Sequence, residues 1–438
     1  MPESKNVSIV GGGMLGMAIS MHLAKMGFNV DLYEASGEPG GLAKGWKIGN
    51  TTWDRFYHVI LMSDSYTRKM LQEIGLEDQL NWVETKTGFY TDGKLYSMSN
   101  TLEFLKFPPL GLIDKFRLGL TIFIASKIKN WKKLENIYVK DWLTKWSGKN
   151  TFNKIWLPLL KAKLGDNYAR TSAAFIWATI QRMYAARKSG LKKEMFGYVN
   201  GGYSTIINQF EKKLNELGVK IHYSHKIETI KKSGRGIQLK FQNGDEVHSE
   251  KVLLTIPSTF ISLICPELTE KENKKLKSVQ YIGVVCASVL LKRPVSPYYV
   301  TNITDTWVPF TGVIEMSALV DKKFFNGNSL IYLPKYVEPD NPIFNKEEKE
   351  LNEFFKKAFL KMYSELNEKD IITIKIAKAR NVFTLSTINY SEKIAEMKTS
   401  VPGLFITNSS HITNGTLNIN ETLQLGERVI KEIFNEKD

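Results

Sequence analysis

Three glycines and one acid near the start of the chain have the types and spacing of a nucleotide-binding motif. Gly11, Gly13 and Gly16 follow an apolar run, and Glu34 comes about 20 residues later. Glycines at these positions allow a tight turn, a close approach of the backbone to a pyrophosphate, and packing of the next helix against the sheet. The carboxylate can accept both hydroxyls of an adenosine ribose. The pattern predicts that a dinucleotide binds here.

A second group of polar residues could do chemistry at the other end of such a cofactor. Asp54, Arg55 and His58 stand in a dense aromatic stretch soon after the glycine motif. The alternative is a strand whose aromatic side chains pack in the core, but charged groups are rarely buried without a partner or a function. We therefore take Arg55 and His58 as candidate catalytic residues, with His58 able to donate or accept a proton. No metal site is expected.

These residues need particular elements to position them. The β-branched run before Gly11 predicts a strand, the apolar period after it predicts a helix to about Met26, and residues 29–33 predict a second strand. The first helical residues, Met14 and Leu15, offer unpaired backbone N–H groups and the positive end of the helix dipole to phosphates. A glycine-rich turn without a ligand is the weaker alternative, because a strand and a helix flank the motif.

Composition and charge narrow the class of protein. The 438 residues have room for two or three domains, and the two cysteines form no CxxC pair, so neither a disulfide framework nor a zinc site is expected. A net charge of +15 favours an anionic partner. The basic residues are spread along the chain and no nucleic-acid motif occurs, so we expect no nucleic-acid partner. Since the first strand begins near residue 7, we expect no signal peptide and a cytoplasmic protein.

One stretch leaves a membrane contact open. Residues 102–125 are rich in apolar side chains, but charged residues interrupt them and the run is too short to span a bilayer. Four lysines and Trp131 follow at 127–133. Such a helix can lie in a membrane interface, which would place the protein peripherally at the inner face of the membrane. The alternative, which we weigh more heavily, is a helix packed on the core with a basic end.

The last helix is expected to face the reactive part of the cofactor. A short strand ends near residue 408, and Asn418 can cap a helix that runs to about Phe434, with Glu421 placed three residues later as in a capping box. Exposed N–H groups at that helix start would stabilise negative charge on a reduced flavin. The glycine motif and this helix start must then lie on the same side of the molecule.

Four segments, in this order, resemble the flavin-dependent amine oxidase superfamily, which includes phytoene desaturases, protoporphyrinogen oxidase and, more distantly, UDP-galactopyranose mutase. They are the loop at 11–16 with Glu34, the pair Gly40-Gly41 in EPGGLA, the GGY at 201–203 with the hairpin that follows, and PGLFIT at 402–407. The chain looks most like bacterial FAD-dependent oxidoreductases described as protoporphyrinogen-oxidase-like. It departs from the family at Asn408-Ser409, where Gly-Asp is common, and at Glu421-Thr422, where Ser-Gly is common.

The resemblance implies FAD as the cofactor, the second glycine pair beside the pyrophosphate, and backbone contacts to adenine near Lys226. The residues expected to contact FAD are Gly11, Gly13, Met14, Leu15, Gly16, Glu34, Ala35, Gly41, Leu42, Lys226, Ile227, Asn408, Ser409, Asn418, Ile419 and Asn420. The expected fold is α/β: a Rossmann-like FAD-binding domain built from residues 1–95, 201–258 and 396–438, a helical subdomain at 96–200, and a mixed-sheet substrate domain at 259–395.

The expected function is an FAD-dependent oxidoreductase that transfers hydride between flavin N5 and a carbon of a largely apolar, lipid-like small molecule. No second strand–GxGxxG–helix unit is present for NAD(P)H, so an external electron acceptor or donor is expected. The alternatives are a redox-neutral, flavin-dependent mutase or isomerase acting on a nucleotide sugar, and a non-catalytic flavoprotein.

Overall fold

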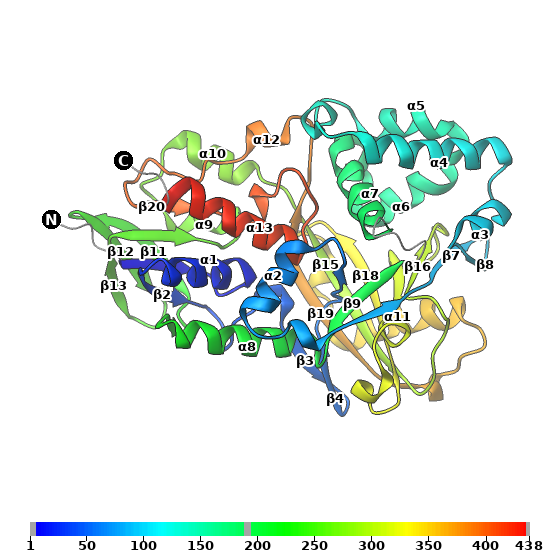
Figure 1. The fold of residues 1–438 in the computed structure, drawn as a ribbon, viewed down its shortest axis with the longest axis horizontal. Helices are drawn as coiled ribbons and strands as arrows, with labels where there is room; N and C mark the ends of the chain where they lie inside the picture. Colours follow the sequence, from blue (N-terminus) through cyan, green and yellow to red (C-terminus); the bar gives the residue numbers. More distant parts are fainter. Residues whose placement is uncertain (1–5, 188–193, 435–438) are drawn as a thin grey trace.

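The structure, a computed structural model, describes residues 6–187 and 194–434. A parallel sheet with its helices forms one end of the molecule, and a helical region and a larger mixed sheet lie beside each other at the other end (Figure 1). This is the expected α/β architecture, with a nucleotide-binding sheet assembled from distant parts of the chain.

The parallel sheet brings together segments from the start, middle and end of the sequence. Its strand order is β10-β2-β1-β14-β20, and every neighbouring pair is parallel. The strands are β1 (Asn6–Val10), β2 (Asn29–Tyr33), β10 (Lys220–His222), β14 (Lys251–Leu254) and β20 (Leu404–Ile406). Their carboxyl ends therefore meet at one edge, where ligands bind in open α/β sheets.

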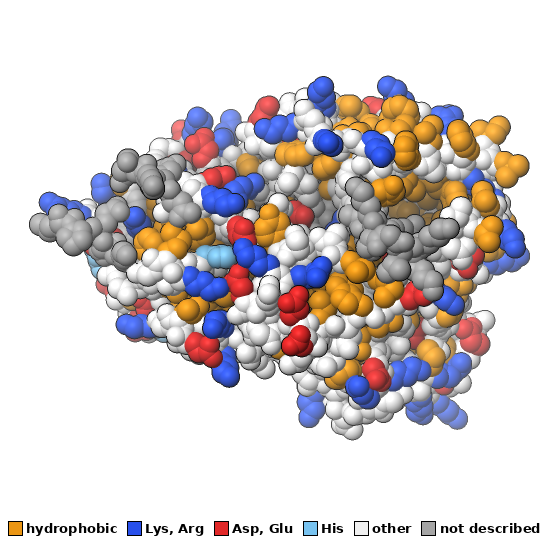
Figure 2. Space-filling view, viewed as in Figure 1, with side chains coloured by type: hydrophobic (Ala, Val, Ile, Leu, Met, Phe, Trp, Pro, Cys, Tyr) orange, Lys and Arg blue, Asp and Glu red, His pale blue; other side chains and the backbone are white. Residues whose placement is uncertain are grey.

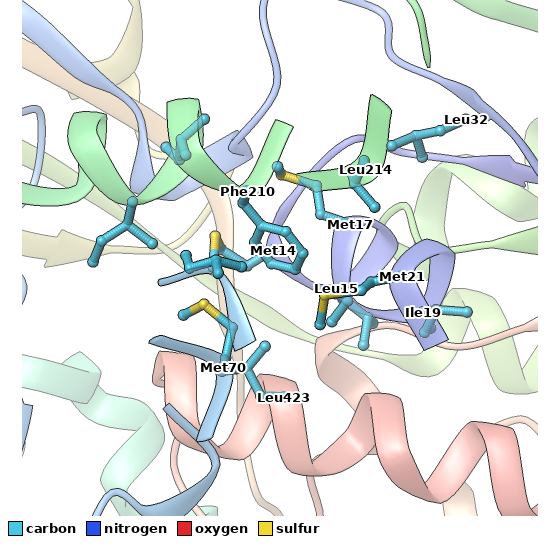
Figure 3. Packing of buried hydrophobic residues seen from close by; sticks show 14 of the residues in the cluster. Met14, Leu15, Met17, Ile19, Met21, Leu32, Met70, Phe210, Leu214 and Leu423 are labelled. Atoms are coloured by element: carbon cyan, nitrogen blue, oxygen red, sulfur yellow. The ribbon is translucent and has the colours of Figure 1, made fainter. Parts of the chain in front are cut away.

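Helices cover one face of this sheet and a hairpin sheet covers the other. On the first face are α1 (Met14–Lys25), α8 (Gly202–Glu216) and α13 (Ile419–Val429), with α2 (Ser65–Glu73) packed on α13. Figure 3 shows side chains of α1, among them Met14, Leu15 and Met17, meeting Phe210 of α8 and Leu423 of α13. On the second face, β11 (Ile227–Ser233), β12 (Gly236–Phe241) and β13 (Glu246–Ser249) bury Leu239 and Phe241 against the strands. This two-sided burial is what apolar parallel strands require.

The larger sheet has the order β19-β15-β18-β17-β16-β7-β8, and only β16 and β7 pair in parallel, so it is mixed. Its strands are β7 (Thr87–Thr91), β8 (Lys94–Ser97), β15 (Tyr281–Leu291), β16 (Val300–Ile303), β17 (Gly312–Glu315), β18 (Ser329–Val337) and β19 (Ile371–Thr384). Helix α11 (Glu348–Met362) packs Phe355 and Phe359 on this sheet. Strands β7 and β8 thus belong to this sheet, although the expected nucleotide-binding domain includes residues up to 95. The exact domain limits stay a prediction.

Helices fill the region between residues 101 and 187. They are α3 (Thr101–Lys106), α4 (Leu112–Lys127), α5 (Val139–Thr151), α6 (Leu157–Leu164) and α7 (Ala173–Arg187). Pro158 lies in the first turn of α6, directly after the π-helical turn Phe152–Trp156. Two small sheets connect the regions: β3 (Gly45–Ile48) with β4 (Thr51–Asp54), and β5 (Ile60–Leu61) with β9 (Met195–Val199) and β6 (Leu80–Glu84). Among residues 6–187 and 194–434, every helix is too short or too polar to traverse a bilayer.

Candidate functional site

The loop after β1 folds tightly on itself and on the end of β14. Gly11 has φ +115°, and its N–H donates to the Tyr33 carbonyl at 2.8 Å. A Cβ on Gly11 would lie 2.5 Å from Thr255 Oγ1, and one on Gly16 would lie 1.9 Å from the Gly11 carbonyl oxygen. Both positions therefore require glycine. From its place in the motif, Gly16 is expected to let the helix pack on the sheet, whereas its closest neighbour is the loop itself.

Gly13 opens onto free space at the start of α1. A Cβ there would meet no atom within 4 Å, and no side chain caps the helix. A second glycine segment lies against it: Gly40 N–H donates to the Gly12 carbonyl at 2.7 Å, and a Cβ on Gly41 would lie 3.2 Å from Gly13 Cα. The two segments form a ledge of bare backbone beside free helical N–H groups. Such a ledge fits a pyrophosphate.

Exposure separates the residues of this ledge into two kinds. Ala35, Gly41 and Leu42 are exposed. Met14 and Leu15, by contrast, point into the core beneath α1 (Figure 3). Only the backbone of those two residues can contact a cofactor.

Glu34 stands beside the ledge with its carboxylate already oriented. Oε2 accepts the Gly12 N–H at 2.8 Å, and Oε1 accepts the N–H and Oγ–H of Ser36 at 2.9 and 2.6 Å. A carboxylate has about four lone-pair sites, so about one remains, on Oε2. The prediction that Glu34 accepts both ribose hydroxyls therefore requires Ser36 to give up a bond, whereas one hydroxyl fits without change.

Lys44 supplies a buried positive charge next to Glu34. Its side chain is 7% exposed, and its Nζ donates to Ser36 Oγ. Burial lowers the pKa of Lys44, and the nearby carboxylates of Glu34 and Glu38 oppose that shift. A cation held below a glycine ledge is suited to a dinucleotide pyrophosphate. The residues present thus fit the group that the fold implies.

The segment between β10 and β11 also reaches Glu34. The Glu34 N–H donates to the His222 carbonyl at 2.9 Å, and the His225 N–H donates to the Glu34 carbonyl at 2.9 Å. Lys226 and Ile227 come directly after His225. Both residues therefore follow a segment that is hydrogen-bonded to Glu34. Their expected backbone contacts to adenine stay a prediction.

The last helix packs directly on the first one. A Cβ on Gly426 of α13 would lie 3.6 Å from Ala18 Cβ of α1. Asn418 caps α13, since its Oδ1 accepts the Glu421 N–H at 3.0 Å. Helix α13 and the glycine loop that leads into α1 therefore lie on the same side of the parallel sheet, as a single extended cofactor requires.

Asn420 and Glu421, which follow the Asn418 cap, interact with other elements of the fold. Asn420 Oδ1 accepts the N–H groups of Tyr66 and Thr67 at 2.9 and 3.2 Å, and so anchors the first turn of α2. The carboxyl group of Glu421 is largely buried, which raises its pKa, while Arg182 opposes the shift. The start of α13 is thus held by side chains on both sides, and Ile419 remains half-exposed between them.

Asn408 is buried and its side chain is occupied. Its Nδ2 donates to the Ile256 carbonyl at 2.8 Å, and its Oδ1 accepts the N–H and Oγ–H of Ser410 at 3.0 and 2.7 Å. These bonds tie the ends of β14 and β20 together. The geometry therefore gives the Asn408 side chain a structural task, while the half-exposed Ser409 next to it remains accessible.

The acid of the aromatic cluster also turns out to be structural. Asp54 is buried, and its Oδ1 accepts the Tyr203 N–H at the start of α8 at 2.8 Å. Its Oδ2 lies 3.7 Å from His58 Nδ1, which is too far for a hydrogen bond. Burial raises the pKa of Asp54, and His58 and the Tyr203 N–H oppose that shift.

The two candidate catalytic residues have unused polar atoms. Arg55 lies with its guanidinium 5.5 Å from the centre of the Trp46 ring, and the His58 ring is 4.8 Å from that of Tyr203. In the described part of the chain, Arg55 Nε and His58 Nδ1 are buried without a hydrogen-bond partner. Such buried atoms need a hydrogen-bond partner, which a ligand or an ordered water can supply.

Sequence reasoning gave no role to the half-buried residues on the other side of this cluster. Tyr57 Oη and Tyr336 Oη are 2.7 Å apart. Lys163 Nζ lies 4.8 Å from the centre of the Tyr336 ring and 5.4 Å from that of Phe383. Burial lowers the pKa of Lys163 to about 8, and the nearby Arg182 adds to the shift. In sequence Lys163 is one of two lysines in a short helix, and no pattern marks it.

Arg182 completes this group from helix α7. Its Nη2 is 3.0 Å from Asp64 Oδ2, and the same oxygen accepts the Leu61 N–H at 2.9 Å.

A separate cavity of about 370 Å³ lies between Tyr138, Arg170 and Lys393, and none of the residues predicted to contact FAD lines it. Among the residues that the structure describes, no three His, Cys, Asp or Glu side chains gather as a metal site would require.

Comparisons with known proteins agree with this geometry. The model of the family "Flavin containing amine oxidoreductase" matches residues 16–415. The chain is 21% identical over 283 residues to a 15-cis-phytoene desaturase of Glycine max, covering 60% of this chain and 49% of that protein. It is 22% identical over 311 residues to the zeta-carotene-forming phytoene desaturase of Myxococcus xanthus, covering 62% and 58%. The matched parts thus span about half to three-fifths of these relatives.

Solved structures resemble the chain over nearly its whole length. An oxidoreductase from Methanosarcina mazei has a TM-score of 0.75 at 14% identity, covering 98% of this chain and 100% of that one. Reduced UDP-galactopyranose mutase has a TM-score of 0.73 at 14% identity, covering 97% and 93%. At such identities the likeness shows the fold alone.

Proposed function

This chain belongs to the flavin containing amine oxidoreductase family, and from that premise we propose that it is an FAD-dependent oxidoreductase acting on a largely apolar small molecule. Bound FAD would supply hydride transfer at its N5 atom. The remaining tasks fall to the protein: to hold the cofactor, to orient the substrate, and to manage charge and protons near the reacting atoms.

The glycine ledge is the observation that carries this proposal. The free space at Gly13, the uncapped start of α1 and the contact between Gly13 and Gly41 leave room for a pyrophosphate that touches only backbone. Lys44 places a positive charge next to Ser36 and Glu34, close to Gly40, and Glu34 keeps an acceptor site for a ribose hydroxyl. Each of these groups has a use when a dinucleotide binds.

The reactive end is assigned to the space between α13 and the segment after β4. Helix α13 packs on α1 on the same side of the sheet as the glycine loop, and Arg55 and His58 have polar atoms without hydrogen-bond partners in the described chain. We assign Arg55 to a negative or carbonyl group of the cofactor or substrate. His58 is assigned to holding or moving a proton there.

We place the substrate against the aromatic side chains next to the Arg55 and His58 segment. Tyr57, Tyr336 and Phe383 offer ring surface, which suits a hydrocarbon-rich molecule. Lys163 adds a cation beside these rings, and Arg182, which is paired with Asp64, lies near enough to Lys163 to lower its pKa. A substrate that is mainly apolar but carries one acidic or strongly polar end would satisfy both features. The desaturases among the relatives support the apolar part of this proposal.

Purified full-length protein tests the proposal directly. We expect about one FAD per chain, and bleaching of the oxidised flavin absorbance when a substrate is added without oxygen, followed by recovery when oxygen or a quinone is added. Failure to bind FAD would refute the cofactor assignment. Turnover only after reduction by dithionite, with no acceptor consumed, would instead establish the redox-neutral alternative that the mutase-like fold allows.

A further inference from the structure

The outer side of helices α3 and α4 exposes an unusual number of large apolar side chains. Leu112, Ile113 and Phe116 are 78%, 77% and 72% exposed. We define the α3–α4 face as these three residues together with Leu102, Leu105, Leu120 and Phe123, all of them exposed. Hydrophobic side chains gather at the upper right of Figure 2, where Figure 1 places these helices. Contiguous exposed apolar surface of this kind marks an interaction site.

Helix α4 is apolar on two opposite sides. Its inner side buries Leu118, Thr121 and Ala125 against the protein. Positions 112, 113, 116, 120 and 123 recur at helical spacing on the outer side. Packing of α4 on the core, which is the interpretation favoured from sequence, therefore accounts only for the residues on its inner side. The other half needs a second apolar medium.

The charges around the face are positive. Residues 101–133 contain seven lysines and arginines against two acids. Lys106, Lys127 and Lys129 are exposed, and Lys127 Nζ lies 5.3 Å from the centre of the Phe123 ring.

The two acids of this stretch are already engaged. Glu103 accepts bonds from Ser97 and Ser99, and Asp114 accepts a bond from Asn150. The basic groups at the rim therefore remain available to an external anion.

We propose that the α3–α4 face docks on the surface of an anionic lipid bilayer, with the apolar side of α4 in the interface and the lysines at the headgroups. An apolar helix face with basic residues at its rim is the pattern of such binding. A second copy of the chain fits less well, because a twofold contact through the face would bring Lys106 and Lys127 of both copies together. The proposal does not depend on the flavin site.

Vesicle co-sedimentation of the full-length protein tests this proposal. We expect binding to vesicles of phosphatidylcholine with phosphatidylglycerol, and weaker binding to phosphatidylcholine alone. The double variant Phe116→Glu/Phe123→Glu should lower the partition constant at least about tenfold, since it places two charges in the interface. Lys106→Gln/Lys127→Gln should remove the preference for the anionic vesicles. Bound flavin and thermal midpoint report that each variant is folded.

Leu263→Glu is the matched control. Leu263 is 74% exposed on α9 (Ser258–Ile264), which is not part of the α3–α4 face. It should leave vesicle binding unchanged. The proposal is overturned if the wild type binds neither vesicle at low salt, or if the control loses binding as much as the face variant. It is also overturned if the face variants turn a dimer into a monomer without any change in vesicle binding.

Discussion

The hydroxyl groups of Tyr57 and Tyr336 lie 2.7 Å apart, and this hydrogen bond joins the segment after β4 to β18 of the larger sheet. Burial raises the pKa of Tyr57 to about 12, so both hydroxyls stay protonated at neutral pH. The ammonium group of Lys163 lies over the ring of Tyr336. The pair therefore links the part of the chain next to the nucleotide-binding sheet to the residues proposed to meet the substrate.

Removing both hydroxyls of this pair should cost less stability than the sum of the two single removals. In Tyr57→Phe or Tyr336→Phe, the remaining hydroxyl loses its partner, and we expect a loss of about 1–3 kcal/mol in the free energy of unfolding. In the double variant neither hydroxyl is left unpaired, and the loss should be smaller than the sum of the single losses. Urea unfolding of the four proteins measures this coupling. Strictly additive losses would show that the bond is not made.

Gly13→Ala should weaken FAD binding without unfolding the protein. A Cβ at Gly13 meets no protein atom within 4 Å, so the apoprotein should keep its thermal midpoint. The methyl group would fill space assigned to the pyrophosphate, and we expect FAD affinity to fall about tenfold or more. Flavin fluorescence titration gives the affinity.

Gly119→Ala is a control for that measurement, because its Cβ also meets no atom within 4 Å and it lies in α4. It should bind FAD as the wild type does. Equal FAD affinity in Gly13→Ala and the wild type would contradict the placement of the pyrophosphate.

Lys163→Met should stabilise the protein at neutral pH. The pKa of Lys163 falls from 10.5 to about 8 on folding, so the folded chain releases its proton more readily. Wild-type stability should therefore rise with pH between about 8 and 10.5, and the variant should lack this rise. Removing the buried cation should add about 1–3 kcal/mol at pH 7.

Values of KM for acidic and neutral substrates show whether Lys163 contacts the substrate or is only buried. If Lys163 orients an acidic end of the substrate, Lys163→Met raises KM for acidic substrates and leaves KM for neutral analogues unchanged. Lys161→Met, in the same helix but exposed, should alter neither stability nor KM. An equal effect of both variants would argue against this assignment.

Glu315→Gln should flatten the dependence of stability on pH below neutrality. Glu315 is buried, and burial raises its pKa to about 7, against the bonds it accepts from the N–H groups of Val295 and Ser296. Because the folded chain holds this proton more tightly, its contribution is complete below about 4.5 and is lost as pH rises to about 7. Thermal unfolding from pH 4.5 to 7.5 should show the slope vanish in Glu315→Gln and persist in the exposed Glu353→Gln.

His58→Gln should slow reduction of the flavin by substrate while FAD stays bound. His58 lies with an unpartnered ring nitrogen beside Tyr203, and loss of a positioned acid or base lowers a rate by about 10²-fold or more. Rapid mixing without oxygen measures the reduction step. His248→Gln, at an exposed position of β13, serves as the control. Full-rate reduction in His58→Gln would remove His58 from the site.

Local patterns predicted the nucleotide-binding part of this molecule well. The strand–glycine loop–helix unit, Glu34 at the end of the second strand and the Asn418 cap all depend on a few adjacent residues, and the structure confirms each of them. The FAD cofactor and the oxidoreductase class agree with the family that the chain belongs to.

Contacts between distant residues could not be predicted in this way. Asp54 resembles an active-site acid in sequence, but its partner is the N–H of Tyr203, which only the fold brings near. Lys163 and Tyr336 come from a helix and a strand far apart in the chain, and neither stands in a motif. The Asn408 side chain is hydrogen-bonded to Ile256 and Ser410. A comparison with the Gly-Asp pair that is common in the family at this position does not reveal these bonds.

The strand order of the parallel sheet has a consequence for biosynthesis. Strand β20 lies at the edge, beside β14, and comes from residues 404–406. A ribosome must therefore translate the chain from β14 past residue 404 before that edge can be covered, and until then β14 presents unpaired backbone groups to other nascent chains. Premature termination shortly before residue 404 leaves a polypeptide with most of its core residues and an open, aggregation-prone sheet.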